Sequence, residues 1–269
     1  MGAPRLKQAG WTRAVRIVLA GLILSPAALV AEVKKPAGSD PQSIVVVPPA
    51  LREIAVKAEY FLDLCNAMKL EWPKNRAITI VCHGHSVPAG YFKTPAVRIF
   101  DAYPMLLHKT LCDRFPTAVI NVTVTAIGGE NSVKGAERFE RDVLSLRPDV
   151  VTIDYGLNDR PIGLQAARQA WASMIEKAKA ANIKVILLTP TPDMAAKLDD
   201  VADPLNRHAN LIRELAAEYQ VGLVDSLATF KKYLHDGGKL EEVMSQGNHP
   251  NRKGHELVAA ELAEWFGGR

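Results

Sequence analysis

The sequence predicts an α/β fold in which a parallel sheet of about five strands is covered by helices on both faces. Short apolar runs alternate with longer segments of helical period, and each crossover between parallel strands requires such a connection. The alternating part is about 190 residues long, has no internal repeat and suits a single domain. The apolar runs cover residues 77–83, 118–125, 149–155, 183–189 and 221–225. The clearest helical stripe is Leu164, Ala167, Trp171, Ile175 and Ala178.

The first 31 residues have the pattern of a secretory signal peptide. Four basic residues precede an apolar run from Ile17 to Val30, and small residues surround an expected cleavage point near Ala31. The apolar run is about 15 residues long and is interrupted by Pro26, whereas a membrane span needs roughly 20. We therefore expect an exported protein, periplasmic or secreted, with no membrane anchor.

The charge balance depends on whether this segment is removed. The whole chain has 33 Lys and Arg against 29 Asp and Glu, and residues 1–31 hold four of the basic residues and no acidic one. The remaining chain is neutral and has no long basic run interleaved with aromatic residues. Nucleic acid is therefore not an expected partner. The oligomeric state is left open by the sequence.

Residues 32–76 are expected to form a linker and an N-terminal helix ahead of the main domain, residues 77–269. The segment after residue 31 is polar and rich in Pro, Gly and Ser, which is typical of an exposed linker. Near residues 49–70 apolar side chains recur at helical spacing, and this pattern ends before the Trp72-Pro73 pair. The stripe consists of Leu51, Ile54, Ala55, Ala58, Phe61 and Leu62.

Three cysteines, Cys65, Cys82 and Cys112, cannot all pair within one chain. Cys82 lies in an apolar run, and we expect it to be a small core residue. A disulfide between two of the three stays open, because an oxidising compartment would permit it.

Polar and glycine-rich segments follow three of the predicted strands, and a fourth precedes the last predicted helix. Open parallel sheets bind their ligands at the carboxyl ends of the strands, so these segments should meet at one edge. They read GHS at 84–86, AIGGENS at 126–132, YGLNDR at 155–160 and SQGNHPNRKGH at 245–255.

The residue types in these segments suit acyl transfer from an ester. A serine hydroxyl becomes a good nucleophile when an imidazole takes its proton, and Ser86 and His249 would form this pair. The oxyanion that develops needs fixed donors, and the backbone N–H of Ser86, the backbone N–H of Gly129 and the side-chain amide of Asn158 could supply them. Each position also has an ordinary reading as a turn or helix cap. Tyr91 and Phe92 are candidates to line the acyl pocket, and packing under the following helix is the alternative.

Taken together, the segments resemble the sequence blocks of the SGNH, or GDSL, hydrolase superfamily over about residues 77–267. The resemblance implies that Ser86 is the nucleophile, Gly129 and Asn158 are oxyanion-hole residues and His249 is the general base. The final block, HPN followed by GH, is especially similar. The family resemblance also implies a three-layer α/β/α sandwich of flavodoxin-like type, and ester hydrolysis that needs no cofactor and no metal.

Two positions depart from the family pattern. The residue before the nucleophile is usually Asp, and here it is His85. The carboxylate that usually lies three residues before the histidine is replaced by Gln246. A backbone carbonyl of the Gln246 segment could orient the imidazole instead, which would make a Ser-His dyad. Glu242 or Asp236 could also reach it from the preceding segment.

Other classes of protein fit parts of the pattern. The GHS segment resembles the G-x-S-x-G nucleophile elbow, but Pro88 occupies the place of its last glycine. A metal-dependent hydrolase could use His83 and His85 together with Asp159 or His249. The missing carboxylate also permits a non-catalytic, carbohydrate-binding protein on the same fold.

The expected substrate is a small-molecule or polysaccharide ester. We favour a short acyl group, such as acetyl on a carbohydrate, for an exported member of this family. A lipid, aryl or thioester substrate is the alternative.

Overall fold

The computed structural model describes residues 54–267 and contains the predicted parallel sheet. All five predicted strands form, and the strand order is β2-β1-β3-β4-β5 with every pairing parallel. This is the flavodoxin-like order, in which ligands bind where the chain direction of the crossovers reverses, between β1 and β3. The strands are β1 (Ala77–Gly84), β2 (Val119–Val124), β3 (Val150–Asp154), β4 (Lys184–Leu188) and β5 (Gly222–Val224).

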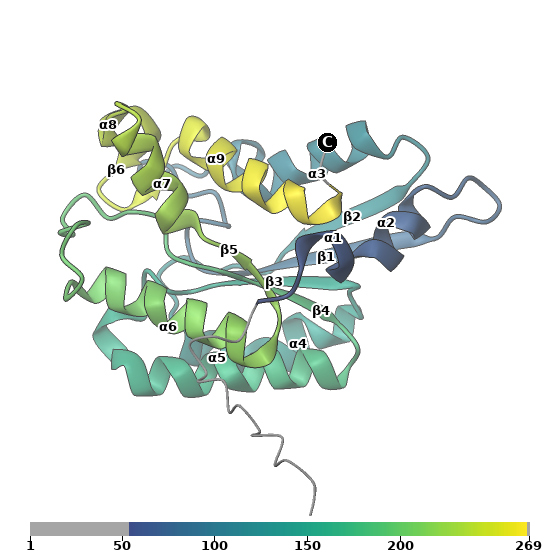
Figure 1. Cartoon of the computed structure of the whole chain (residues 1–269), viewed down its shortest axis with the longest axis horizontal. Helices are drawn as coiled ribbons and strands as arrows, with labels where there is room; N and C mark the ends of the chain where they lie inside the picture. The colour runs from purple at the N-terminus through teal and green to yellow at the C-terminus, as the bar shows by residue number, and fades with distance from the viewer. Residues whose placement is uncertain (1–53, 268–269) are drawn as a thin grey trace, which may run out of the picture. The chain divides into compact units, whose positions relative to one another are not determined.

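Helices cover both faces of the sheet, as the α/β/α architecture requires (Figure 1). The helices α4 (Ser132–Asp142), α5 (Gly163–Ala180) and α6 (Pro204–Tyr219) pack on one face. The opposite face is covered by α3 (Tyr103–Arg114), α7 (Ser226–His235) and α9 (Arg252–Ala263). Each layer buries its own apolar core, so β1 and β3 are covered on both sides. The short helices that follow β1 are η2 (Ile99–Asp101), η3 (Leu144–Leu146), η4 (Arg160–Ile162), α8 (Leu240–Val243) and η5 (Glu264–Phe266).

The N-terminal helix is divided, where a single helix was expected to end near residue 70. Its described part consists of α1 (Lys57–Tyr60) and α2 (Leu62–Met68), which meet at Phe61. Phe61 leaves the helical conformation, with φ −114° and ψ 18°. Its buried ring packs 4.8 Å from that of Phe266 and reaches the core from the break. The burial of one large aromatic side chain thus overrides the local helical period.

The expected signal peptide and most of the expected linker lie outside the described residues. Among residues 54–267, no helix has the length and apolar character needed to cross a membrane. Cys82 is a fully buried core residue of β1, as expected. Within this part of the chain all three cysteines are free thiols, two of them buried and Cys112 exposed.

A small antiparallel hairpin near the C-terminus was not predicted. It pairs β6 (Met244–Gln246) with β7 (His249–Pro250). The hairpin is followed at once by α9, whose first turn is capped by the side chain of Asn251. The glycine-rich segment around His249 is therefore held between a strand pair and a helix start.

Candidate active site

The first strand ends in a close approach to its neighbour. Gly84 pairs with Asp154 of β3, and a Cβ on Gly84 would lie 2.5 Å from the Asp154 carbonyl oxygen. It would also lie 2.8 Å from a ring carbon of Pro88. A glycine is therefore required where β1 turns toward the segment that bears Ser86. This turn places Ser86 at the carboxyl edge of the sheet, next to the β1–β3 switch point.

Ser86 and His249 meet at this edge, although 163 residues separate them. The Nε2 atom of His249 lies 2.9 Å from the Oγ atom of Ser86. Both side chains are more than nine-tenths buried. The distance is that of a hydrogen bond between a nucleophilic hydroxyl and a general base.

The other nitrogen of His249 faces a backbone carbonyl. Nδ1 lies 3.2 Å from the carbonyl oxygen of Phe92, which can only accept a hydrogen bond. The proton of the neutral ring is therefore on Nδ1, which leaves the Nε2 lone pair free to accept the Ser86 proton. Burial lowers the pKa of His249, and the Phe92 carbonyl partly offsets this effect. The imidazole is accordingly neutral, and able to act as a base, near neutral pH.

The orienting carbonyl belongs to Phe92, where a carbonyl of the Gln246 segment was expected. Gln246 contacts the Phe92 loop instead: its Oε1 accepts the N–H of Thr94 at 2.9 Å, and its Nε2 donates to the Thr94 hydroxyl at 3.3 Å. The hydroxyl of Ser245 donates to the Phe92 carbonyl itself at 2.9 Å. Both residues belong to β6, so this strand fixes the loop that carries the Phe92 carbonyl.

The two acidic residues considered as partners for His249 are engaged elsewhere. Glu242 accepts from the hydroxyl of Tyr233 and pairs with Lys253. Asp236 pairs with Lys232 one helical turn away, on an exposed face. Neither carboxylate contacts His249.

Two further predicted residues, Gly129 and Asn158, line the same cavity as Ser86. Gly129 adopts a positive φ of 81°, and a Cβ there would have open space around it. The Asn158 amide donates one N–H to the carbonyl of Glu130 at 2.9 Å, and its second N–H is available to a ligand. Within the described residues, the backbone N–H groups of Ser86 and Gly129 donate to no protein acceptor. Three residues that line one cavity, Ser86, Gly129 and Asn158, thus each have an unused N–H donor.

A single open cavity of about 390 Å³ joins these groups. All of the predicted site residues line this cavity. Other side chains, which the sequence motifs did not single out, line it as well. The lining consists of Ser86, Tyr91, Thr94, Gly128, Gly129, Asn158, Gln246, Asn248 and His249. Of the two expected aromatic residues, Tyr91 lines this cavity and Phe92 does not. Thr94 and Asn248 were missed, because neither type is distinctive in a loop; their nearness to the motif residues was the only available signal.

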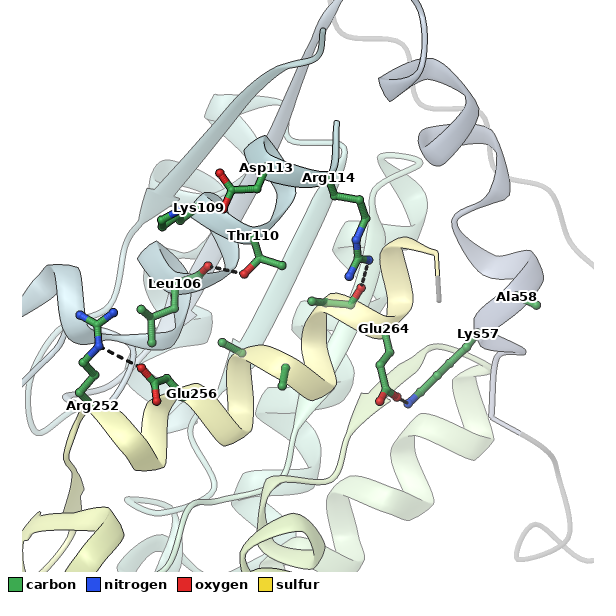
Figure 2. Close-up of a pocket in the computed structure, with 13 residues that line it drawn as sticks. Lys57, Ala58, Leu106, Lys109, Thr110, Asp113, Arg114, Arg252, Glu256 and Glu264 are labelled. Atoms are coloured by element: carbon green, nitrogen blue, oxygen red, sulfur yellow. Dashed lines mark hydrogen bonds and ion pairs between the residues drawn. The ribbon is translucent and has the colours of Figure 1, made fainter. Parts of the chain in front are cut away.

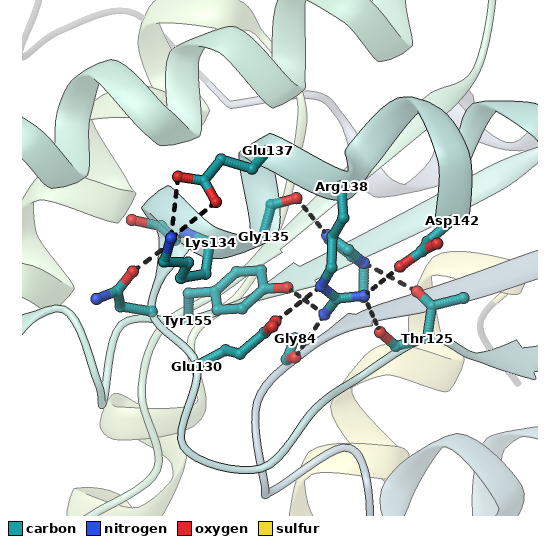
Figure 3. Close-up of polar contacts among 12 residues, drawn as sticks. Gly84, Thr125, Glu130, Lys134, Gly135, Glu137, Arg138, Asp142 and Tyr155 are labelled. Atoms are coloured by element: carbon teal, nitrogen blue, oxygen red, sulfur yellow. Dashed lines mark hydrogen bonds and ion pairs between the residues drawn. The ribbon is translucent and has the colours of Figure 1, made fainter.

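A buried arginine holds the loops of this edge together (Figure 3). Arg138 of α4 donates to the carboxylate of Glu130 at 2.7 Å and to the hydroxyl of Tyr155 at 2.9 Å. It also reaches the carbonyl of Thr125, just after β2. The loops that carry Gly129 and Asn158 are therefore fixed to one charged group. Sequence reasoning missed Arg138, because nothing in its helix distinguishes it from a surface arginine.

Asp159 makes a second connection between α4 and the loop that follows β3. Its two oxygens accept the backbone N–H of Ser132 and the indole N–H of Trp171, both at 2.7 Å. Burial raises the pKa of this carboxyl. Asp159 thus joins the start of α4 to the loop that follows β3, and its oxygens are engaged with these donors.

His83, proposed as a metal ligand in one alternative, has protein partners on both ring nitrogens. They lie 2.8 Å from the Thr125 hydroxyl and 3.1 Å from the carbonyl of Gly135. Among residues 54–267, no group of three or more His, Cys, Asp or Glu side chains is placed to hold a metal ion.

A larger cavity, of about 910 Å³, lies away from this edge, against α3 and α9 (Figure 2). Its charged residues are paired with neighbours: Lys57 with Glu264 at 2.7 Å, and Arg252 with Glu256 at 3.0 Å. Arg114 donates to carbonyl oxygens at the end of α9. The charged side chains of this cavity thus connect neighbouring helices, and no serine-histidine pair lines it.

A flavodoxin-like sheet with a serine after β1 and a histidine just before the last helix defines a hydrolase of the SGNH type. Residues 82–257 match the GDSL-like Lipase/Acylhydrolase family, and the chain belongs to this family. The match contains every predicted site residue.

Three similar proteins are named as esterases of acetylated polysaccharides. An acetylxylan esterase of Xylanibacter ruminicola is 27% identical over 233 residues, which cover 75% of this chain and 46% of that protein. The chain thus spans about half the length of this relative. The fold is similar to that of an acetylxylan esterase from Geobacillus stearothermophilus, with a TM-score of 0.62, 21% identity and coverage of 71% and 95% of the two chains. A two-domain esterase active on acetylated mannans has a TM-score of 0.63 and 21% identity, with coverage of 78% of this chain and 52% of that one.

Proposed function

We propose that this protein is a serine esterase that removes a short acyl group, such as acetyl, from a carbohydrate. The observation that carries the proposal is the 2.9 Å contact between Ser86 Oγ and His249 Nε2, in a cavity that also contains Gly129 and Asn158. A hydroxyl, a neutral imidazole and fixed donors within one cavity are the groups that acyl transfer requires.

In the first half-reaction Ser86 Oγ attacks the ester carbonyl as His249 Nε2 takes its proton. The resulting oxyanion lies among the N–H groups of Ser86, Gly129 and Asn158, which stabilise it more than they stabilise the neutral carbonyl. His249 then gives the proton to the departing alkoxide oxygen of the sugar. The products are the free alcohol and an acyl ester on Ser86.

Water completes the reaction by attacking the acyl-enzyme. His249 takes a proton from the water, and the same donors hold the second oxyanion. When this intermediate collapses, Ser86 Oγ recovers the proton and the carboxylic acid leaves. The Phe92 carbonyl accepts a hydrogen bond from Nδ1 throughout and so favours the imidazolium that forms twice in the cycle. Ser86 and His249 thus act as a dyad.

The shape and polarity of the edge support a carbohydrate ester. A second cavity, of about 550 Å³, adjoins the first and shares Gly129 and Asn158 with it. Asn131, Arg160 and Asp203 line this second cavity beside small apolar residues. Such a mixture of hydrogen-bonding and apolar surface suits a sugar ring better than an acyl chain. The named relatives act on acetylated xylan or mannan, which points to the same substrate class.

Substitution of the nucleophile tests the proposal. We expect Ser86→Ala to lower turnover of p-nitrophenyl acetate by about 10⁴–10⁶-fold while the melting temperature changes little. A serine-directed phosphonate should label the wild type at Ser86, as read by mass spectrometry of peptides. Ser226→Ala, which removes another buried hydroxyl on α7, is the matched control and should keep wild-type activity. Near-normal turnover in Ser86→Ala would contradict the assignment.

The substrate class needs a separate comparison. Acetylated xylan and mannan fragments should be deacetylated, and kcat/KM for p-nitrophenyl esters should fall from acetate to octanoate. A preference for the long chain would favour a lipid ester instead. We also propose export, from the pattern of residues 1–31; N-terminal sequencing of the mature protein, expected to begin near residue 32, would test it.

A further inference from the structure

A second imidazole lies next to the nucleophile and has no part in the mechanism above. His85 is fully buried, and its Nδ1 atom lies 3.2 Å from the backbone N–H of Val87 and 3.5 Å from Ser86 Oγ. Its Nε2 atom lies 3.3 Å from the carboxylate of Asp154, at the end of β3. The other oxygen of this carboxylate accepts the hydroxyl of Tyr103 at 3.3 Å. Ser86 Oγ therefore lies between two histidines.

The contact with Val87 determines which nitrogen of His85 carries the proton. A backbone N–H can only donate, so Nδ1 must present a lone pair to it. The proton of the neutral ring is then on Nε2, the nitrogen that lies 3.3 Å from the buried carboxylate of Asp154. The line of this contact falls outside hydrogen-bond geometry, so the attraction is chiefly electrostatic. Asp154 favours this tautomer because it attracts the Nε2 proton.

The opposite tautomer would interfere with the reaction. A proton on Nδ1 would point toward Val87 N–H, a second donor, and toward Ser86 Oγ. A hydrogen bond donated to Oγ stabilises its lone pairs and weakens it as a nucleophile. With Nδ1 unprotonated and engaged by Val87, the Ser86 proton is instead directed to His249, whose Nε2 is 0.6 Å closer.

We propose that Asp154 keeps the His85 proton on Nε2, so that His85 acts as a positioning residue that leaves Ser86 Oγ free to attack. This role rests on the proposed function of Ser86 and His249. It also accounts for a histidine at a position where the resemblance leads one to expect Asp. Both side chains can accept the N–H two residues ahead, but a second carboxylate at position 85 would face that of Asp154.

A double-mutant cycle tests whether Asp154 works through His85. Asp154→Asn removes the charge with little change of shape, and we expect kcat for p-nitrophenyl acetate to fall about tenfold with KM within about twofold. His85→Asn keeps an acceptor for Val87 N–H. In that background Asp154→Asn should change kcat by less than about twofold. Asp149→Asn, the same substitution just before the other end of β3, is the matched control and should leave kcat unchanged.

Nitrogen-15 NMR of labelled histidines reads the tautomer directly. The His85 signals, identified by their absence in His85→Asn, should show the proton on Nε2 in the wild type and a shift toward Nδ1 in Asp154→Asn. A proton on Nδ1 in the wild type, or an equal loss of kcat from Asp154→Asn in both backgrounds, would overturn the proposal. If the wild type neither hydrolyses esters nor takes up the phosphonate, the proposed function fails, and the His85 signals alone decide the tautomer.

Discussion

Gln246 replaces the carboxylate that the family resemblance leads one to expect, and its side chain holds a neighbouring loop instead of the histidine. Both ends of the amide bind Thr94, two residues after the carbonyl of Phe92 that orients His249. A neutral acceptor on a loop can fix an imidazole only if the loop itself is fixed. We therefore assign Gln246 an indirect effect on the base.

Gln246→Ala should lower kcat about 3–30-fold, because it removes two hydrogen bonds, each of which contributes about 1 kcal/mol to the order of the Thr94 loop. KM for a small ester should change much less. Gln246→Glu is the control, since it keeps an acceptor for the Thr94 N–H. Steady-state kinetics on p-nitrophenyl acetate would measure the effect. Equal losses in both variants would show that the charge or the cavity lining, and not the loop contact, is what matters.

At the scale of elements, the end of β1 controls where Ser86 lies. Gly84 lets β1 and β3 approach closely. The buried pair of His85 and Asp154 joins the carboxyl ends of the same two strands. On the other side of the edge, Arg138 joins α4 to the loops after β2 and β3. The site is thus built from contacts between strand ends, which the sheet register brings together.

Gly84→Ala should lower the free energy of unfolding by about 1–3 kcal/mol, because the new Cβ would overlap a backbone carbonyl that cannot move alone. Activity should fall as well, since the turn to Ser86 must shift. Urea denaturation and ester hydrolysis would measure the two effects. Gly247→Ala has nothing within 4 Å of its new Cβ and should be close to neutral in stability. A stable and fully active Gly84→Ala would refute the packing argument.

The five strands of the parallel sheet could be predicted from the sequence, and the two short strands of the hairpin could not. Each strand of the sheet is an apolar run bounded by polar or turn residues, and that local signal is enough to place it. The β6–β7 hairpin has strands of three and two residues, too short for a period to show. The break at Phe61 was not predictable from spacing, because the aromatic residues that receive its ring are about 200 positions away.

At the scale of the whole molecule, buried neutral histidines connect stability to pH. Burial, aided by the nearby Arg138 charge, lowers the pKa of His83 to about 4, and burial lowers that of His255 to about 3. Both values lie below that of an unfolded histidine, so the unfolded chain binds protons first as the pH falls. Protonation therefore favours unfolding below about pH 6.5.

The free energy of unfolding should fall as the pH is lowered from 7 to 5, by about 1–2 kcal/mol for each of these histidines. Burial raises the pKa of Asp159 and Glu261, which acts in the opposite direction. Comparison of the wild type with His83→Gln cancels the contribution of these carboxyl groups. The free energy of unfolding should depend less steeply on pH in the variant. Urea denaturation at pH 7, 6 and 5 would measure both slopes. Parallel slopes would contradict a neutral, buried His83.

The sequence by itself determined the alternation of helices with the five strands of the parallel sheet and, through it, the meeting of Ser86, Gly129, Asn158 and His249. This was possible because apolar period is a local property, and because parallel strands bring their carboxyl ends to one edge. Only the tertiary structure decided that the Phe92 carbonyl orients His249 and that His85 faces Asp154. Every residue carries a carbonyl, so no residue type marks the one that a histidine uses. Contacts across strands depend on register, which is set by the packing of both faces at once.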